Sequence, residues 1–185
     1  MVKIWNQERT DWRFVMERGG DCAPLTLRAV GPDHALVVNL GKDATAETAR
    51  RGAAKAVKAV RELGAQSLLL DVTGIKQALG AQGLAAAAQG AELACYRPEC
   101  WKEREDKPFT LYIAGTEGMD AEAVLRETEA VTRAVCFARD LTNRPVNLLT
   151  PALLAQAMAE AVEQVGVEVE ILRKKQTRAL GMGAF

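Results

Sequence analysis

Three short apolar runs, set between longer stretches of helical periodicity, constrain the fold of this chain more than any other feature. The runs are HALVVNLG (34–41), SLLLDV (67–72) and FTLYIAG (109–115). Runs of this length that are rich in branched residues and bounded by Gly or Pro predict buried strands. Strands that alternate with helices predict an α/β fold, with a parallel or mixed sheet and helices on both of its faces.

The stretches between these strands carry apolar residues at helical spacing. A first helix is predicted over 45–63, with Glu47 in the first turn, where the helix dipole favours an acid, and Gly64 as its stop. A second helix is predicted over 77–96, and its many Ala and Gly residues would let its backbone pack close to a sheet. A third, more charged helix over 121–141 is predicted to be a long connector.

The first 33 residues contain two further strand-like runs. WRFVM (12–16) and LTLRAV (25–30) could both form strands. Because they are short and close in sequence, we predict an edge hairpin.

Charge and composition limit the classes of protein. Twenty-four basic residues balance 24 acidic ones, so no net field favours nucleic acid or an acidic membrane. No apolar run is long enough to cross a bilayer, and the N-terminus lacks the apolar centre of a secretory signal. We therefore expect a cytoplasmic protein without a membrane partner, whose four cysteines are reduced thiols.

The sequence offers little for a metal site. Cys95 and Cys100 lie five positions apart in CYRPEC, and His34 is the sole histidine. A structural zinc site needs four Cys or His ligands. We interpret these thiols as buried or incidental.

An acidic cluster follows the second helix. Glu103, Glu105 and Asp106 stand beside Arg104 and Lys107. Converging carboxylates are what a two-metal hydrolase needs. A charge run of mixed sign is more typical of a solvated loop, which is our interpretation.

A basic stripe marks the first helix. It comprises Arg51, Lys55 and Lys58, flanked by Arg50 and Arg61. Clustered Lys and Arg can neutralise DNA phosphates. Acidic residues bracket the stripe and the chain is neutral overall, so we favour a solvated face over DNA binding.

The segment GTEGMD (115–120) lies between a strand and a helix, which is where phosphate-binding loops occur. Its spacing matches neither common phosphate-loop pattern. We interpret it as a turn in which Asp120 caps the next helix.

The stretch ARDLTNRPVNLLTPALLA (138–155) is too specific for a plain linker. Thr150 and Pro151 predict the start of a new helix. Asn143 and Asn147 are interpreted as residues that satisfy the backbone of the turn. The alternating VEVEIL (167–172) predicts a half-exposed strand, and a helical turn is expected over 176–180.

These last motifs closely resemble the beginning of the catalytic domain of the leucyl (cytosol) aminopeptidase family. In that family an Ala-Arg-Asp-Leu helix end leads to an Asn-x-Pro-x-Asn-x-x-Thr-Pro turn, a Val-Glu-Val strand and a Leu-Gly-Met-Gly segment. The matching positions are Ala138 to Leu141, Asn143, Pro145, Asn147, Thr150, Pro151, 167–169 and 180–183. The upstream LVVNLGK, RELGA and GAELACYRPECWK also resemble the family's N-terminal domain. Within the Asn-x-Pro-x-Asn turn, Arg144 stands where an acidic residue is frequent in the family.

The resemblance implies a great deal about the parent protein. It implies a macro-domain-like N-terminal domain, a hexamer, and a catalytic domain with two divalent metal ions, zinc or manganese. Some members of the family also bind DNA. The family's metal-binding motifs, Asp-Ser-Gly-Gly and Asn-Thr-Asp-Ala-Glu-Gly, do not occur in this sequence. We therefore expect no catalytic, cofactor-binding or metal residue in this chain.

Three segments are expected: an N-terminal α/β domain over 1–118, a linker helix over 119–143, and a truncated start of the catalytic domain over 144–185. The first would be an assembly or regulatory domain of an enzyme that removes N-terminal amino acids from peptides. Its partners would be its missing catalytic domain and further copies of itself. The alternative is an independent module on a macro-like fold that binds nucleic acid or an ADP-ribose-like ligand.

Overall fold

The computed structural model describes residues 2–6, 10–18, 25–30, 35–98 and 108–183. The chain divides into two separate compact units, Met1–Ala138 and Arg139–Phe185. None of the described helices is both long enough and apolar enough to span a bilayer.

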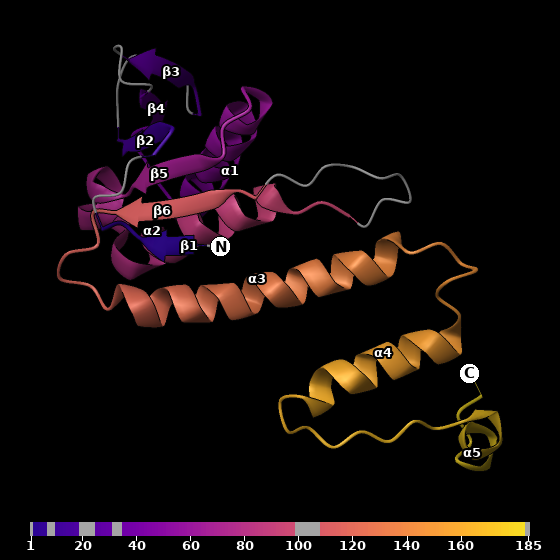
Figure 1. Ribbon diagram of the computed structural model, residues 1–185. Helices are drawn as coiled ribbons and strands as arrows, with labels where there is room; N and C mark the ends of the chain where they lie inside the picture. The colour runs from indigo at the N-terminus through magenta and orange to yellow at the C-terminus, as the bar shows by residue number, and fades with distance from the viewer. Residues whose placement is uncertain (1, 7–9, 19–24, 31–34, 99–107, 184–185) are drawn as a thin grey trace. The chain divides into compact units, whose positions relative to one another are not determined.

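The first unit is built on a six-stranded sheet with the strand order β1-β6-β5-β2-β4-β3 (Figure 1). The strands are β1 (Val2–Ile4), β2 (Trp12–Glu17), β3 (Leu27–Val30), β4 (Ala35–Asn39), β5 (Ser67–Asp71) and β6 (Thr110–Ala114). All neighbouring pairs are parallel except β3 and β4, which are antiparallel. The predicted strands β4, β5 and β6 are confirmed, and the sheet is mixed.

The prediction of an N-terminal edge hairpin is wrong. β2 lies inside the sheet between β4 and β5 and is parallel to both, and its Phe14 and Met16 are fully buried. Of the two predicted strands only β3 lies at an edge of the sheet, where it pairs with β4. The sequence pattern of such a short strand does not distinguish an edge position from a central one. The strands that pair with β2 also come later in the chain, so its local sequence does not reveal them. The sequence analysis also missed β1, whose three residues are too few to show a period.

Helix α1 (Ala46–Glu62) begins and ends as its sequence predicts. The Thr45 hydroxyl accepts a hydrogen bond from the Thr48 N–H (3.2 Å), and the Thr48 hydroxyl accepts one from the Thr45 N–H (2.8 Å). This reciprocal pair satisfies two donors that a helix start leaves open. Gly64 ends the segment with a φ of +81°, a left-handed conformation that favours glycine.

Helix α2 (Thr73–Cys95) begins four residues before its predicted start. Asp71 Oδ1 accepts a hydrogen bond from the Thr73 N–H (3.0 Å), so the carboxylate at the end of β5 fixes the start of the helix. Gly80 departs from helical geometry (φ 49°, ψ −136°) and kinks the helix. This kink lies within the predicted stretch, three residues after its predicted start.

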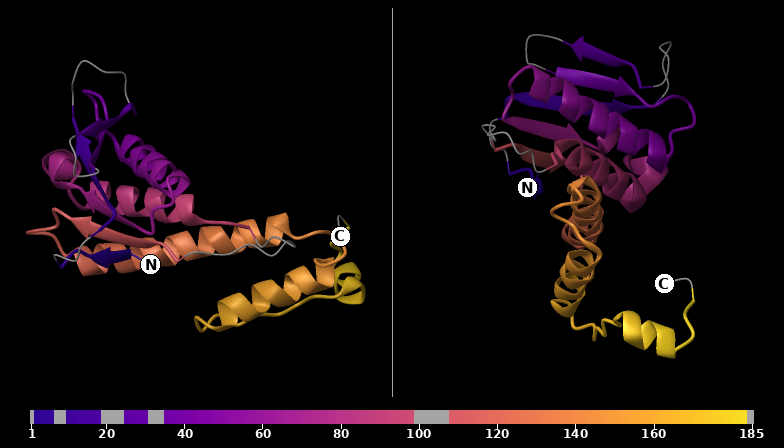
Figure 2. Two further views of the ribbon diagram at one scale, coloured as in Figure 1. Left: turned by 45° about the horizontal axis from the view of Figure 1, so that its top comes forward. Right: turned by 90° about the vertical axis from the view of Figure 1, so that its right-hand side faces the viewer.

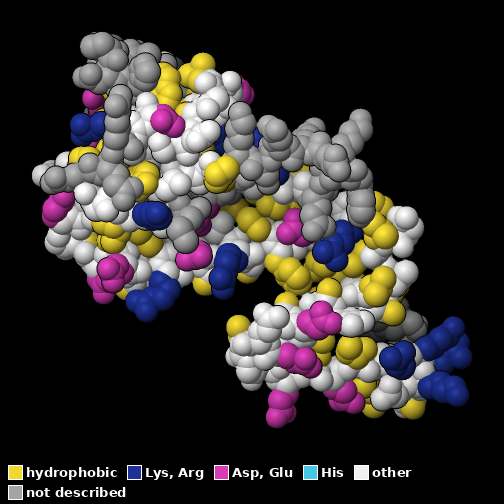
Figure 3. All heavy atoms as spheres, viewed as in Figure 1, with side chains coloured by type: hydrophobic (Ala, Val, Ile, Leu, Met, Phe, Trp, Pro, Cys, Tyr) yellow, Lys and Arg dark blue, Asp and Glu magenta, His cyan; other side chains and the backbone are white. Residues whose placement is uncertain are grey.

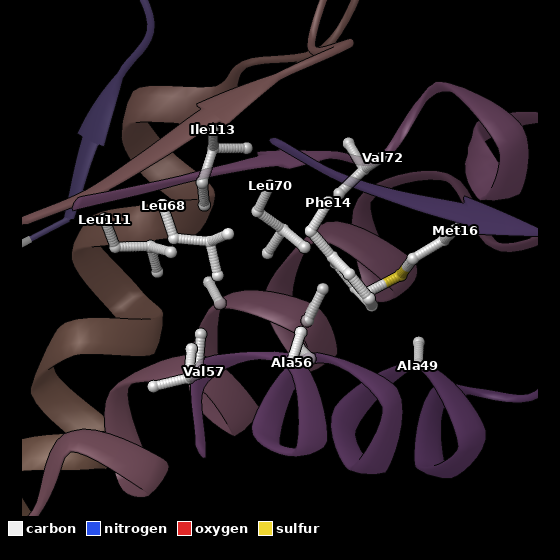
Figure 4. Packing of buried hydrophobic residues seen from close by; sticks show 14 of the residues in the cluster. Phe14, Met16, Ala49, Ala56, Val57, Leu68, Leu70, Val72, Leu111 and Ile113 are labelled. Carbon is white, nitrogen blue, oxygen red and sulfur yellow. The ribbon is translucent and has the colours of Figure 1, made fainter. Parts of the chain in front are cut away.

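The hydrophobic core lies between one face of the sheet and the helices α1 and α2. Figure 4 shows Phe14, Leu68 and Leu70 of the sheet directed toward Ala56 and Val57 of α1. Both helices lie on the same side of the sheet (Figure 2), and they make the largest set of helix–helix contacts in the chain. Alanine and valine on α1 leave room for the larger side chains of the strands.

Helix α3 (Ala121–Asn143) is confirmed, and its residues up to Ala138 belong to the first unit. Val124 and Leu125 pack against the same core cluster as α1 and α2. Helix α3 thus adds to the core that α1 and α2 form, in keeping with the expected α/β class. The opposite face carries the other side chains of each strand, including the polar Arg13 and Asp71, because side chains alternate across a strand.

The second unit contains α4 (Pro151–Glu163) and the short α5 (Lys174–Ala179). Thr150 caps α4 through its hydroxyl, which accepts from the Leu153 N–H (3.4 Å), and Pro151 occupies the first turn, as predicted. The predicted strand over 167–172 is not formed. A strand needs a partner for its backbone groups, and no described segment pairs with this one.

Candidate functional site

The parallel strands β2, β5 and β6 end at one edge of the sheet, where ligand sites of open α/β folds commonly form. Asp71 is the last residue of β5, and its carboxylate lies 2.5 Å from Nη2 of Arg13 on β2. Burial raises the pKa of Asp71, but hydrogen bonds from Thr73 and Arg13 outweigh it and hold the pKa below its usual value. The Asp71 carboxylate thus links β5 to β2 and to the start of α2 through its hydrogen bonds, and its role is structural.

The glycine-containing turn 115–120 lies at the same edge. A Cβ at Gly115 would lie 2.4 Å from Thr73 Oγ1, so the backbone of the turn packs directly on the start of α2. Asp120 Oδ1 accepts a hydrogen bond from the Ala123 N–H (3.1 Å), which confirms the predicted cap. The geometry is that of a tight connection rather than an open phosphate cradle.

Three of the five basic residues on α1 make contacts within the protein, whereas Arg51 and Lys58 are exposed. Arg50 pairs with a glutamate one turn earlier and donates through Nε to Gln89 (2.7 Å). Lys55 donates to the Leu25 carbonyl (2.8 Å), and Arg61 donates to a carbonyl at the end of α2 (3.1 Å). On the face shown in Figure 3, basic side chains are interspersed with acidic ones. These contacts favour a structural and solvated face, in keeping with the sequence interpretation.

Several residues considered as metal ligands lie outside the described residues, namely Glu103, Glu105, Asp106, Cys100 and His34. Cys95 is a half-buried free thiol, and burial raises its pKa. Within the described ranges, no group of three or more His, Cys, Asp or Glu could hold a metal ion. The described residues therefore do not fit a dinuclear metal centre.

The turn between α3 and α4 is held by its own backbone. The N–H groups of Leu148 and Leu149 both donate to the Pro145 carbonyl (2.8 and 3.1 Å). Asn143 is the last residue of α3, and Asn147 belongs to the turn. Asn143 thus lies at a helix end and Asn147 in a turn, which are the positions that the sequence indicates.

One cavity of about 220 Å³ in the first unit was not found by sequence reasoning. It is lined by residues of α2, α3, β1, β6 and the segment before β6: Val2, Glu92, Cys95, Phe109, Leu111, Glu129, Thr132, Arg133 and Cys136. Burial raises the pKa of Glu92; the neighbouring Thr132 hydroxyl opposes this shift and the nearby charge of Glu129 adds to it. These elements are distant in sequence and come together only in the folded chain, so no local motif predicts the cavity.

Two family models match different parts of the chain. Residues 25–104 match the N-terminal domain of the cytosol aminopeptidase family, and residues 136–185 match its catalytic domain. Together the two matches cover more than half of the chain. The chain belongs to the cytosol aminopeptidase family.

Sequence relatives agree with this assignment. A probable cytosol aminopeptidase of Rhizobium etli is 34% identical over an alignment of 174 residues, and the match covers 86% of this chain and 34% of the relative. Another, from a Synechococcus strain, is 32% identical over an alignment of 184 residues, and the match covers 91% of this chain and 36% of the relative. This cytosol aminopeptidase family chain thus spans about a third of the length of the curated relatives it matches.

Solved structures show the same fold. The bottromycin maturation enzyme BotP is 27% identical with a TM-score of 0.72, covering 94% of this chain and 41% of BotP. A mutant tomato leucine aminopeptidase has a TM-score of 0.78 at 17% identity, covering 99% of this chain and 46% of the tomato chain. The expected α/β class, in an arrangement like that of a leucine aminopeptidase, is confirmed for this member of the cytosol aminopeptidase family.

Proposed function

We propose that this chain provides the N-terminal α/β domain and the beginning of the catalytic domain of a metal-dependent aminopeptidase. The observation that carries the proposal is the order of the two family matches, N-terminal domain over 25–104 and catalytic domain over 136–185. The parent enzyme removes N-terminal amino acids from peptides in the cytoplasm. The boundaries we propose are 1–118 for the N-terminal domain, 119–143 for the linker helix, and 144–185 for the part of the catalytic domain.

The chain itself acts in assembly rather than in chemistry. Its second unit exposes many large apolar side chains, which Figure 3 shows among acidic ones. The most exposed are Val146 (87%), Val165 (76%), Leu180 (64%), Met158 (52%) and Val167 (51%). Apolar surface of this kind is typical of a surface that a partner covers. The partner is the remainder of the catalytic domain, within a homo-oligomer that we propose is a hexamer.

The two divalent metal ions belong to the part of the family's catalytic domain that this chain does not match. BotP has been solved in complex with Mn, which supports metal dependence in this fold. The sequence of this chain contains neither of the family's metal-binding motifs. Its described residues also lack a fitting cluster, so the chain alone is proposed to be inactive.

Hydrolysis of a leucine anilide with added Mn²⁺ or Zn²⁺ tests the proposal. A full-length relative, such as the Rhizobium etli protein, should cleave the anilide, whereas this chain, shown to be folded by circular dichroism, should not. Metal-dependent hydrolysis that persists through repurification and scales with this chain would refute its inactivity. Failure of the full-length relative to cleave any N-terminal residue would refute the peptidase assignment itself.

A further inference from the structure

The cavity beside Glu92 is lined by both apolar and charged side chains. Val2, Phe109 and Leu111 supply the apolar part, from β1, β6 and the segment before β6. Two thiols, Cys95 of α2 and Cys136 of α3, also line it. Such a mixture of apolar surface and a few polar groups is typical of a small-ligand site.

Glu92 presents an unused acceptor inside this cavity. Its Oε2 atom is buried and has no hydrogen-bond partner among the described residues. The hydroxyl of the neighbouring Thr132 donates to the Thr128 carbonyl (2.9 Å). Buried carboxyl oxygens without a donor are rare and costly, so this atom calls for a donor that a ligand could bring.

Charges of both signs complete the site on α3. Glu129 and Arg133 both line the cavity, are exposed, and lie one turn apart on the helix. Glu92 and Glu129 together attract a cation such as an ammonium group. The Arg133 guanidinium offers the planar pair of donors that a carboxylate prefers.

We propose that this cavity binds an α-amino acid with an apolar side chain, such as leucine. The ammonium group donates to Glu92 and faces Glu129, and the carboxylate binds Arg133. The side chain packs against the apolar wall of Val2 and Leu111.

The volume of the cavity supports this size of ligand. An apolar cavity of about 150 Å³ holds benzene, whereas drug-sized ligands occupy about 300–1,000 Å³. At about 220 Å³ the cavity has room for a single amino acid. Its carboxyls and thiols form no metal-binding group among the described residues.

This site is distinct from peptide hydrolysis and does not depend on the peptidase proposal. It lies wholly within the first unit and uses no residue of the segment that matches the catalytic domain, apart from Cys136 at its margin. Binding can therefore be measured on this chain alone.

The two thiols provide a direct measure of occupancy. The 185-residue chain is treated with N-ethylmaleimide at pH 8, and labelling of each cysteine is followed by peptide mass spectrometry. Leucine should slow the labelling of Cys95 and Cys136 in a saturable manner. Isoamylamine, which lacks the carboxylate, and 4-methylpentanoate, which lacks the ammonium, should each protect only at much higher concentration. Glycine, which lacks the apolar side chain, should not protect.

Matched variants assign the groups. Glu92→Gln and Arg133→Met should each weaken leucine protection by about tenfold or more, since each removes a hydrogen bond to a charged group. Glu127→Gln, on α3 but outside this cavity, should leave it unchanged. Each variant is compared with and without leucine, because Glu92 itself influences the pKa of Cys95.

The proposal is overturned if saturating leucine protects neither thiol in the folded chain. It is equally overturned if Glu92→Gln and Arg133→Met, shown to be folded by thermal unfolding, protect as well as the unaltered chain. Equal protection by 4-methylpentanoate and leucine would show that the cavity does not recognise an ammonium group.

Discussion

Two carboxyl groups of the first unit, the buried Asp71 and the partly buried Glu92, have opposite environments. Asp71 accepts hydrogen bonds from Arg13 and from the Thr73 N–H, and its pKa is lowered. Glu92 has an oxygen without a donor, and burial raises its pKa. The same chemical group thus stabilises the fold at one site and costs stability at the other.

Asp71→Asn should lower the free energy of unfolding at pH 7 by about 1–3 kcal/mol, because it weakens a charged, mostly buried acceptor. A carboxyl whose folded pKa is depressed stabilises the fold above its unfolded pKa and loses this effect as the pH falls through the folded value. The difference between variant and unaltered chain should therefore shrink under acid conditions. Urea unfolding at pH 7 and at lower pH measures it.

A suitable control is Glu117→Gln, which removes a surface ion pair with Lys76 (3.6 Å). Exposed pairs contribute about 0–1 kcal/mol, so this variant should change stability little at either pH. A loss at Asp71 no larger than the loss at Glu117 would contradict the role assigned to Asp71.

Glu92→Gln should leave stability unchanged in acid and increase it at neutral pH. A carboxyl whose folded pKa is raised contributes fully below its unfolded pKa, and this contribution is lost as the pH rises through the folded value. The glutamine side chain carries no charge at any pH, so the penalty at higher pH disappears. Thermal unfolding between pH 4 and 8 tests this, and a variant that is less stable than the parent at pH 8 would contradict it.

At the scale of the elements, α1 and α2 approach so closely that backbone nearly touches backbone. A Cβ at Gly90 of α2 would lie 2.0 Å from the Arg50 carbonyl oxygen of α1. The small residues of α2 were predicted to allow close packing on a sheet. Gly74 does so against the Met16 carbonyl of β2 (2.0 Å), but Gly90 serves the contact between the two helices instead.

Gly90→Ala should destabilise the chain by about 1–3 kcal/mol, since the added methyl group overpacks a rigid backbone contact. In an exposed helix the same substitution would stabilise by about 1 kcal/mol, so the sign of the change is diagnostic. Gly183→Ala, at a position with open space around it, is the control and should be nearly neutral. Chemical denaturation of both variants gives the comparison.

The sequence predicted the helices and strands better than it predicted which strands pair with one another. The strands at 35–39, 67–71 and 110–114 and the caps at Thr45 and Thr150 follow from local chemistry, namely apolar runs and hydroxyl acceptors. The central place of β2 does not, because its partners are set by the topology of the sheet. The segment 167–172 alternates apolar and polar residues like a strand but pairs with no described segment. Its periodicity reflects only its own residues and does not provide a partner strand. The cavity beside Glu92 draws on four elements and has no local pattern.

At the scale of the whole molecule, the exposed apolar residues of the second unit distinguish it from the first. Leu153 and Met158 of α4 are 46% and 52% exposed. Without a partner, such surface promotes association between copies of the chain. The proposed partner, the rest of the catalytic domain, would cover it.

Leu153→Gln and Met158→Gln should therefore each weaken self-association of the chain by about tenfold, because burying one such side chain contributes about 1.5–3 kcal/mol. Sedimentation velocity over a range of concentrations measures the effect. Glu160→Gln, a polar substitution on the same helix, should leave association unchanged. If the parent chain remains monomeric throughout the range, these residues are not an association surface.

The pairing of β1 with β6 has a consequence for folding. Val2 lies opposite Leu111, so β1 pairs with a strand more than a hundred residues away in sequence. β2 likewise pairs with β4 and β5, which follow it in the chain. Contacts so distant in sequence close slowly, because the chain between them must first be ordered. The edge of the sheet formed by β1 and β6 is therefore expected to close late in folding, after the contacts between elements that are neighbours in sequence.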